Sequence, residues 1–180
     1  MGGLWLWWIG EGQIEREAME HVRLHVERAF RVPAAVWAGQ ARPQGTLDVR
    51  RKQHASGRML EWLLREGPGE GRVLGMTDVD LFIPILTFVF GEAQLNGRAA
   101  VVSTARLSEP VLVDRRVLWE RLAKEAVHEL GHALGLTHCS RPECAMSRSA
   151  GLRDVDRKGG QLCADCRTLL DQAQDREPRT

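Results

Sequence analysis

Residues 128–139 read HELGHALGLTHC and combine three histidines with a glutamate and glycines at fixed spacing. His128 and His132 are four residues apart, so on a helix both imidazoles lie on one face and can reach the same ion. Gly135 can adopt the left-handed conformation that ends a helix and reverses the chain, which lets His138 supply a third nitrogen. Three histidines leave the fourth position of a zinc ion open for water. The stretch therefore predicts a catalytic zinc site, in preference to an amphipathic helix with surface histidines.

Glu129 lies beside the first histidine and projects about 100° away from it on a helix of 3.6 residues per turn. Zinc lowers the pKa of its bound water from 15.7 to roughly 7. We expect Glu129 to accept that proton as a general base and to pass it to the leaving amine. The spacing thus predicts zinc-dependent hydrolysis of peptide bonds. The alternative is a zinc-binding or regulatory protein without catalytic activity, but such a protein would not need a base beside the water.

The four cysteines are confined to the region that follows the histidines: Cys139, Cys144, Cys163 and Cys166. Four thiolates in two close pairs predict a closed tetrahedral zinc site, which holds chain segments together and does no chemistry. An iron–sulfur cluster and a redox dithiol at Cys163–Cys166 are the alternatives. Because Cys139 directly follows His138, we expect the two metal sites to be neighbours.

Composition excludes several classes of protein. The chain has 180 residues, of which 43% are apolar, and this suits one compact domain. A net charge of +1 creates no field that attracts nucleic acid or anionic membranes, and we interpret the basic run at 50–52 as a solvated loop. No segment is long enough to span a bilayer. The apolar residues 4–9 lack the basic flank of a signal peptide, so we expect a buried strand and a cytoplasmic protein with reduced thiols.

Periodicity and turn signals indicate an α/β or α+β chain. Met19, Val22 and Val26 recur at helical spacing, and Asn96-Gly97 is a strong hairpin signal. We expect strands at residues 4–9, 34–38, 72–82, 88–90 and 99–103, and helices at 12–30, 53–65 and from Asp114, as the N-cap, to near Gly135.

Two further pairs of polar residues receive structural interpretations. His21 and His25 are four apart on a predicted helix, but no third ligand follows nearby, so we expect a surface or half-buried pair. Asp78 and Asp80 stand at the end of a predicted strand, where capping of a turn is more common than catalysis.

The motifs together resemble the archaemetzincin family. The resemblance rests on His128-Glu129-x-x-His132-x-x-Gly135-x-x-His138-Cys139-x₄-Cys144-x-Met146 with Cys163-x-x-Cys166, and upstream on Gly75-x-x-Asp78-x-Asp80-Leu81-Phe82 and Phe88-Val89-Phe90-Gly91-Glu92-Ala93. Two features depart from the family pattern: Arg148 stands where an aromatic residue is expected, and the interval from Met146 to Cys163 is one residue shorter.

The resemblance implies a metzincin-like fold, in which helices back a twisted mixed β-sheet and a long helix carries the active site. The single metallopeptidase domain, residues 1–180, would consist of an upper subdomain, 1–135, and a small lower subdomain, 136–180, stapled by the cysteine zinc. The chain would hold two Zn²⁺ ions, one catalytic and one structural.

The resemblance also implies roles around the active site. Met146 would form an apolar floor below the catalytic zinc, although by itself a methionine there indicates only core packing. The strand around 88–93 would pair with an extended peptide. The expected substrates are peptides or proteins, with short peptides cut near the N-terminus. The residues that select them are unknown, and the expected protein is a monomer.

Overall fold

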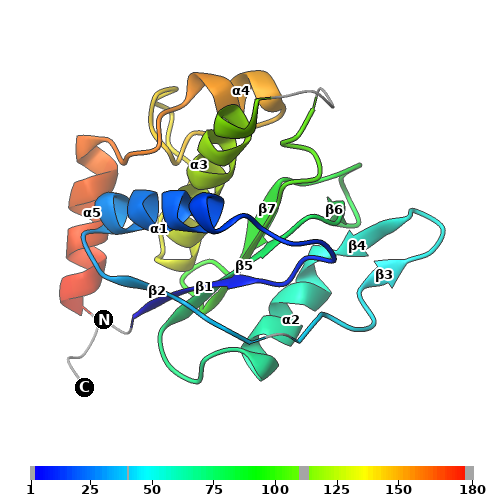
Figure 1. Ribbon diagram of the computed structural model, residues 1–180. Helices are drawn as coiled ribbons and strands as arrows, with labels where there is room; N and C mark the ends of the chain where they lie inside the picture. Colours follow the sequence, from blue (N-terminus) through cyan, green and yellow to red (C-terminus); the bar gives the residue numbers. More distant parts are fainter. Residues whose placement is uncertain (1–2, 40, 110–113, 177–180) are drawn as a thin grey trace.

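A five-stranded sheet forms the centre of the molecule (Figure 1). The computed structural model describes residues 3–39, 41–109 and 114–176, so both ends of the predicted domain, 1–2 and 177–180, lie outside the described residues. The strands follow the order β2-β1-β5-β8-β7, and only β7 runs antiparallel to its neighbour. Their bounds are β1 Leu4–Trp8, β2 Ala34–Val36, β5 Arg72–Thr77, β8 Ala99–Ser103 and β7 Gly91–Ala93.

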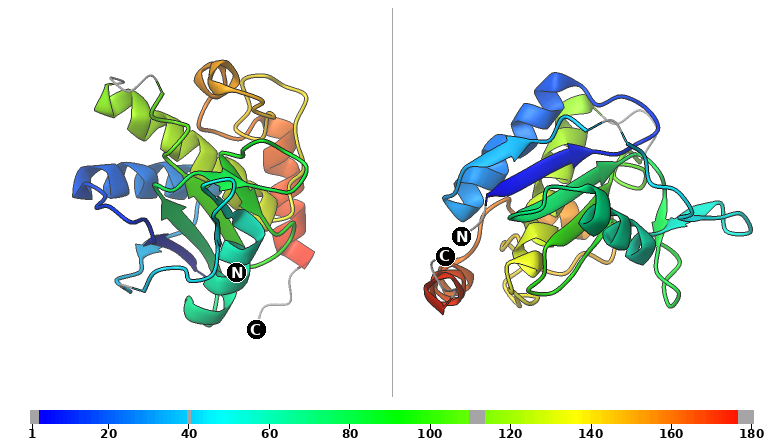
Figure 2. Two further views of the ribbon diagram at one scale, coloured as in Figure 1. Left: turned by 90° about the vertical axis from the view of Figure 1, so that its right-hand side faces the viewer. Right: turned by 90° about the horizontal axis from the view of Figure 1, so that it is seen from below.

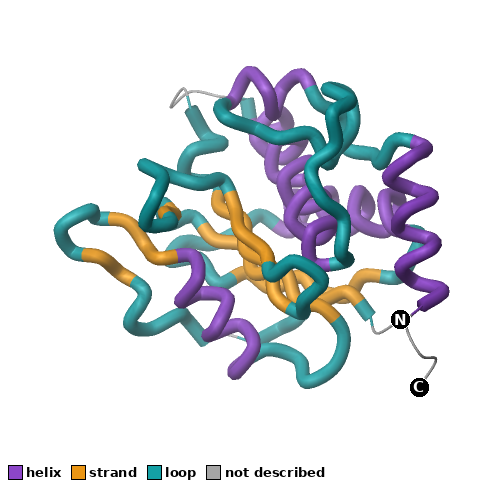
Figure 3. The backbone as a smooth tube through the Cα atoms, turned by 180° about the vertical axis from the view of Figure 1, so that it is seen from behind, coloured by secondary structure: helices purple, strands orange, loops and turns teal. Residues whose placement is uncertain are grey.

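Helices cover both faces of this sheet, which explains why β1, β5 and β8 are apolar almost throughout. Helices α1 (Arg16–Phe30) and α3 (Arg115–Ala133) pack on one face, where they bury Leu6, Leu74 and Val102. Helix α2 (Ser56–Glu66) packs on the other face of the sheet. It contacts the strand residues whose side chains alternate with those three, including Trp7, Val73 and Val101. Seen from behind, α2 lies apart from the remaining helices, with strands between them (Figure 3). The described helices include none that is both long and apolar enough to cross a membrane.

A second, smaller sheet corrects two of the predicted elements. It consists of β3 (Leu47–Asp48), β4 (Gln53–Ala55) and β6 (Leu81–Phe82), and its β3–β4 hairpin projects from the rest of the chain (Figure 2). Residues 53–55 are therefore a strand and not the first turn of a helix, because His54 N–H donates to Asp80 O at 2.8 Å.

The prediction of one strand over 72–82 is also wrong. The chain leaves the large sheet after Thr77, because the Asp78 carboxylate accepts hydrogen bonds from the backbone N–H groups of Glu11 and Gly12 at 2.7 and 2.8 Å. Asp80 pairs with Arg106 at 2.6 Å. Asp78 thus has the capping role that its position indicated.

The strand predicted at 88–90 lies three residues further along the chain. Residues 91–93 form β7, whereas Val89 makes only an isolated bridge to Leu81. The predicted hairpin is present, since β7 and β8 pair antiparallel and Asn96 has a φ of 51° in the turn between them.

Two helices that the sequence analysis did not assign complete the chain. Helix α4 (Leu152–Arg157) lies near α3, and α5 (Ala164–Arg176) lies beside the C-terminal end of α1, where Arg167 donates a hydrogen bond to Ala29 O. Val155 of α4 and Leu170 of α5 belong to the same buried cluster as α1 and α3. The residues that follow Gly135 are therefore continuous with the main core.

Candidate metal centre and active site

Helix α3 begins and ends where its sequence indicates. The Asp114 carboxylate accepts a hydrogen bond from Arg116 N–H at 2.7 Å and caps the first turn. At the other end Gly135 has a φ of +92°, a conformation that a residue with a side chain rarely adopts. Leu136 N–H then donates to Gly131 O at 2.9 Å. The chain reverses there and returns alongside the helix, which brings His138 back to its last turns.

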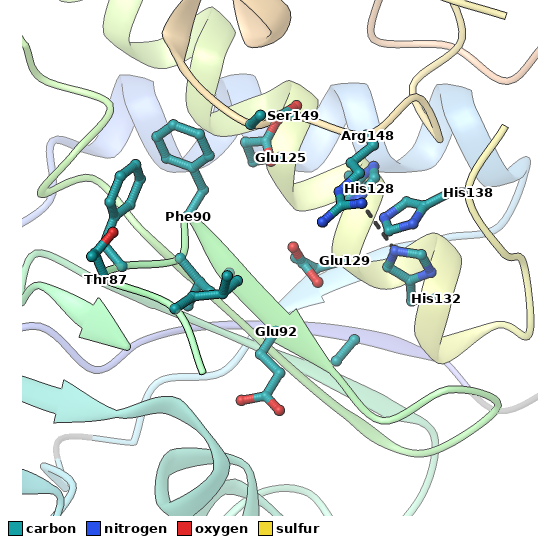
Figure 4. Close-up of a pocket in the computed structure, with 16 residues that line it drawn as sticks. Thr87, Phe90, Glu92, Glu125, His128, Glu129, His132, His138, Arg148 and Ser149 are labelled. Carbon is teal, nitrogen blue, oxygen red and sulfur yellow. Dashed lines mark hydrogen bonds between the residues drawn. The ribbon is translucent and has the colours of Figure 1, made fainter. Parts of the chain in front are cut away.

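The reversal brings the three imidazoles together (Figure 4). The Nε2 atoms of His128 and His132 are 3.2 Å apart, and one ring nitrogen from each of the three histidines lies within 4.8 Å of the others. Two nitrogens bound to zinc at about 2.1 Å in tetrahedral geometry are separated by about 3.4 Å. The histidine set thus fits a zinc ion in donor type and in spacing.

Backbone carbonyls orient the two helical histidines. His128 Nδ1 lies 2.8 Å from Ala145 O, and His132 Nδ1 lies 2.8 Å from Leu136 O. A carbonyl oxygen only accepts, so each Nδ1 carries the proton and each Nε2 presents a lone pair. Burial, followed by the charge of Lys158, lowers the pKa of His128 to about 2. Burial also lowers the pKa of His132 and His138. All three imidazoles are therefore neutral near pH 7, as metal ligands must be.

Glu129 is buried between the histidines and strand β7. Burial raises the pKa of its carboxyl group well above the usual range, and the charges of Glu125 and Glu92 act in the same direction. Gly91 of β7 makes this position possible, because a Cβ atom there would overlap Val101 O and the Glu129 side chain. Sequence reasoning did not identify Gly91, although it stands inside the Phe88–Ala93 motif that carried the family resemblance.

Met146 lies directly below the active-site helix. Its side chain is fully buried, and a Cβ atom on Gly131 would overlap its sulfur. Cys139 N–H donates to Met146 O at 2.9 Å, so the segment after His138 is fixed to the same turn. Gly131 is thus explained by the close approach of this thioether.

A cavity of 410 Å³ opens in front of the three histidines. Residues 86–93 form one wall, and α3 with residues 148–150 forms the other. Arg148, which replaces the aromatic residue of the family pattern, is exposed and projects toward His128 and His138 (Figure 4). The cavity therefore carries a positive charge at its mouth.

The four cysteines form a second cluster beside His138. Their Sγ atoms all lie within 4.8 Å of one another, the thiols are free, and Cys139 and Cys163 are separated by 3.8 Å. Tetrahedral Zn–S bonds of about 2.3 Å place the sulfurs about 3.8 Å apart. Cys163 immediately precedes α5, and a hydrogen bond from the backbone of Cys166 lowers its pKa to about 7. Burial raises the pKa of Cys144 and Cys166, so it is the donor type and the spacing that fit a zinc ion, whose binding would deprotonate the thiols.

A buried ion pair that sequence reasoning missed connects helix α3 to the chain segment after Met146. Lys158 Nζ lies 2.7 Å from Glu125 Oε1, and the two side chains are 0% and 2% exposed. Lys158 also donates to Ser147 O at 3.4 Å, and Ser149 Oγ donates to Glu125 at 3.2 Å. The only sequence signal was Glu125 itself, a charged residue one turn before Glu129. The pair holds the residues after Met146 against α3.

Comparisons with known proteins agree with this geometry. Residues 70–172 match the family model described as Peptidase family M54. The archaemetzincin of Haloquadratum walsbyi is 37% identical over 164 residues, which cover 88% of this chain and 92% of the relative. That of Methanopyrus kandleri is 46% identical over 129 residues, 71% of each chain. The crystal structure of the Methanopyrus kandleri archaemetzincin superposes with a TM-score of 0.87 at 37% identity, over 97% of this chain and 96% of that one.

These matches and the mixed α/β architecture confirm the predicted fold class and the family resemblance. The chain therefore belongs to peptidase family M54, the archaemetzincins, and is a zinc metallopeptidase.

Proposed function

We propose that His128, His132 and His138 hold one zinc ion and that Glu129 is the general base and acid of peptide-bond hydrolysis. The observation that carries this proposal is the convergence of three neutral imidazoles at the wall of a 410 Å³ cavity. The Nε2 atoms of His128 and His132 are 3.2 Å apart, and Glu129 lines the same cavity. The described residues there form a three-nitrogen ligand set with a carboxylate outside it. Such a set would suit a catalytic zinc ion that keeps one position for solvent.

Zinc, when bound, would acidify a water molecule and polarise the scissile carbonyl. Glu129 would accept the proton of the attacking water and transfer it to the leaving nitrogen. Its burial supports this role, because a raised pKa makes the carboxylate a stronger base toward the attacking water. Gly91 and β7 would keep the carboxylate beside the water. Met146 would form the apolar floor under the histidines without contributing a ligand.

The cysteine cluster belongs to the same proposal as a second, structural zinc site. Cys139, Cys144, Cys163 and Cys166 would fill all four positions of the ion. This ion would tie the loop after His138 to the N-terminal end of α5. The lower subdomain, 136–180, would thereby be stapled below the upper subdomain, 1–135, in a monomer with two zinc ions.

The substrates of a peptidase are peptides or proteins, and we propose that short peptides are cut near the N-terminus. Strand β7 is at the edge of the five-stranded sheet, with β8 on one side, so its other side is available to pair with an extended substrate. The cavity volume of 410 Å³ lies at the low end of the range for small-ligand pockets. This size supports a substrate of which only a few residues are enclosed.

The test compares wild type with Glu129→Gln on a mixed peptide library that contains free and acetylated N-termini, with mass spectrometry of the products. Loss of general-base catalysis is expected to lower the rate by about 10²–10⁴-fold, with the zinc content unchanged. Glu61→Gln, which removes an exposed carboxylate of α2, is the matched control. Equal rates for wild type and Glu129→Gln would remove the assigned role.

A catalytically silent zinc protein is the second candidate. Wild-type protein that carries zinc at the histidines and yields no product from any peptide would favour it. Cleavage of acetylated and free peptides at equal rates would retain the peptidase but overturn the preference for N-termini.

A further inference from the structure

A third group of metal-ligand side chains lies away from the active site, where α1 packs against α3. His21 and His25 project from α1 and Glu120 projects from α3, and one ligand atom from each lies within 4.8 Å of the others. The His21 Nε2 atom is 3.0 Å from Glu120 Oε1, and the His25 Nε2 atom is 3.7 Å from Glu120 Oε2. The two imidazole rings are 4.3 Å apart.

These separations suit a shared ion. Two ligand atoms at about 2.1 Å from zinc in tetrahedral geometry are about 3.4 Å apart, and the observed nitrogen–oxygen distances of 3.0 and 3.7 Å lie on either side of this value. The equivalent separation between His128 and His132 in the active site is 3.2 Å. The histidine–carboxylate distances of the α1–α3 group are thus close to the histidine–histidine distance of the catalytic group.

The hydrogen bond of His25 Nδ1 also resembles those of His128 and His132. His25 Nδ1 lies 2.9 Å from the backbone oxygen of His21, which can only accept, so His25 presents its Nε2 lone pair. His21 Nε2 is buried and faces Glu120 Oε1 at 3.0 Å, so it points into the same group of ligand atoms.

The surroundings allow an ion to enter. A cavity of 440 Å³ adjoins His21 and is lined by Arg16, Glu17, Glu20, His21, Leu24 and Trp119. It offers solvent for the remaining coordination position. The charges of Arg16 and Arg28 act against a cation, the charge of Glu120 favours one, and Glu20 is already paired with Arg23 at 2.6 Å.

We propose that His21, His25 and Glu120 form a third metal site, which binds Zn²⁺ and clips α1 to the active-site helix. Two imidazoles and one carboxylate are ligands that zinc accepts in proteins. The sequence did not reveal this site, because Glu120 is far from the two histidines along the chain. The site is independent of the catalytic ligands, since none of its residues lines the active-site cavity.

The test measures a difference in zinc content, so it does not depend on how fully the other sites are loaded. Wild type and the double variant His21→Ala/His25→Ala are equilibrated in the same zinc buffer, freed of unbound metal by gel filtration and measured for zinc per chain by mass spectrometry. We expect one zinc fewer in the variant. The control is Glu17→Gln/Glu20→Gln, which removes carboxylates from the same cavity but leaves the three ligands and should match wild type.

Glu120→Gln provides a second variant if the alanine variant does not fold, because it keeps the size of the side chain. It should also lose one zinc, and ¹¹³Cd spectra of the wild type should contain a nitrogen–oxygen resonance that this variant lacks. Equal zinc content in wild type and the ligand variants would overturn the proposal, and His21 and His25 would then be only a half-buried pair beside Glu120. Equal loss in the control would overturn it too, since binding would then be nonspecific.

Discussion

Replacing Lys158 by methionine removes one partner of the buried Glu125–Lys158 ion pair while keeping the aliphatic stem. The pair has a separation of 2.7 Å, and its two side chains are 0% and 2% exposed. Glu125 would then keep only the hydrogen bond from Ser149 at 3.2 Å. A carboxylate so far from water and without a counter-charge is strongly unfavourable. The folded state should therefore lose more stability than after removal of a surface charge.

The magnitude follows from the burial of both partners. At an effective dielectric constant of about 20, two unit charges about 4 Å apart attract by about 4 kcal/mol. Removal of one partner from a buried ion pair costs about 3–5 kcal/mol. In a chain of this length each kcal/mol lowers Tm by about 2–4 °C, so Lys158→Met should lower Tm by roughly 6–20 °C.

The assay is thermal and urea unfolding, followed by circular dichroism at a fixed free-zinc concentration. Lys124→Met is the matched control, because Lys124 also bonds chain segment 155–156, but only through two carbonyl oxygens at 3.2 Å. We expect the control to cost about 1 kcal/mol. The double variant Lys158→Met/Glu125→Leu should recover most of the loss, because neither partner of the pair then remains as an unpaired buried charge. A single variant within 1 kcal/mol of wild type would refute the reasoning.

Three further changes test other parts of the structure. Gly135→Ala forces a side chain onto a φ of +92° and should cost about 1–2 kcal/mol in urea unfolding. Arg148→Phe removes the positive charge at the cavity mouth and should reduce the rate on acidic peptides relative to their amide counterparts, as competition assays would measure. Asp156→Asn tests the pH dependence of stability. The hydrogen bond from Arg121 lowers the pKa of Asp156 in the folded protein below its ordinary value of 3.8. The pair therefore stabilises the fold above pH 3.8, and this stabilisation is lost as the pH falls through the pKa of Asp156 in the folded protein. The difference in unfolding free energy between wild type and Asp156→Asn should therefore shrink below pH 3.8, and a constant difference would contradict the assignment.

The candidate site was predictable from sequence because its ligands are close together along the chain. His128 and His132 are brought together by one helical turn, and His138 by one glycine reversal, so local geometry nearly determines their convergence. The same reasoning placed the end of α3 near Gly135, and the helix ends at Ala133. The cysteine pairs also have short spacing, although the meeting of the two pairs depends on α5, which periodicity did not reveal.

The features that were missed depend on contacts between distant segments. Residues 72–82 have the apolar composition of one strand, but the hydrogen bonds from Glu11 and Gly12 to Asp78 divide them. Lys158 reads as an ordinary surface residue until the fold places it against Glu125. Two-residue strands such as β3 are set by their partners and not by propensity. Sequence patterns thus predicted local elements and could not predict the long-range contacts that fix them in the fold.

The proposed zinc sites at the histidines and at the cysteines are linked through the chain, because Cys139 directly follows His138. His128 and His132 are fixed by α3, whereas His138 lies on a loop that continues directly into Cys139. That loop is held by the hydrogen bond between Cys139 N–H and Met146 O, and by the cysteine cluster. Zinc at four thiolates is held more strongly than zinc at three exchangeable imidazoles. Cys144→Ser should therefore weaken metal retention at both sites, whereas His138→Ala should affect only the histidine site. Full retention of the histidine zinc in Cys144→Ser would show that α3 and the Met146 turn position His138 without the thiolate cluster.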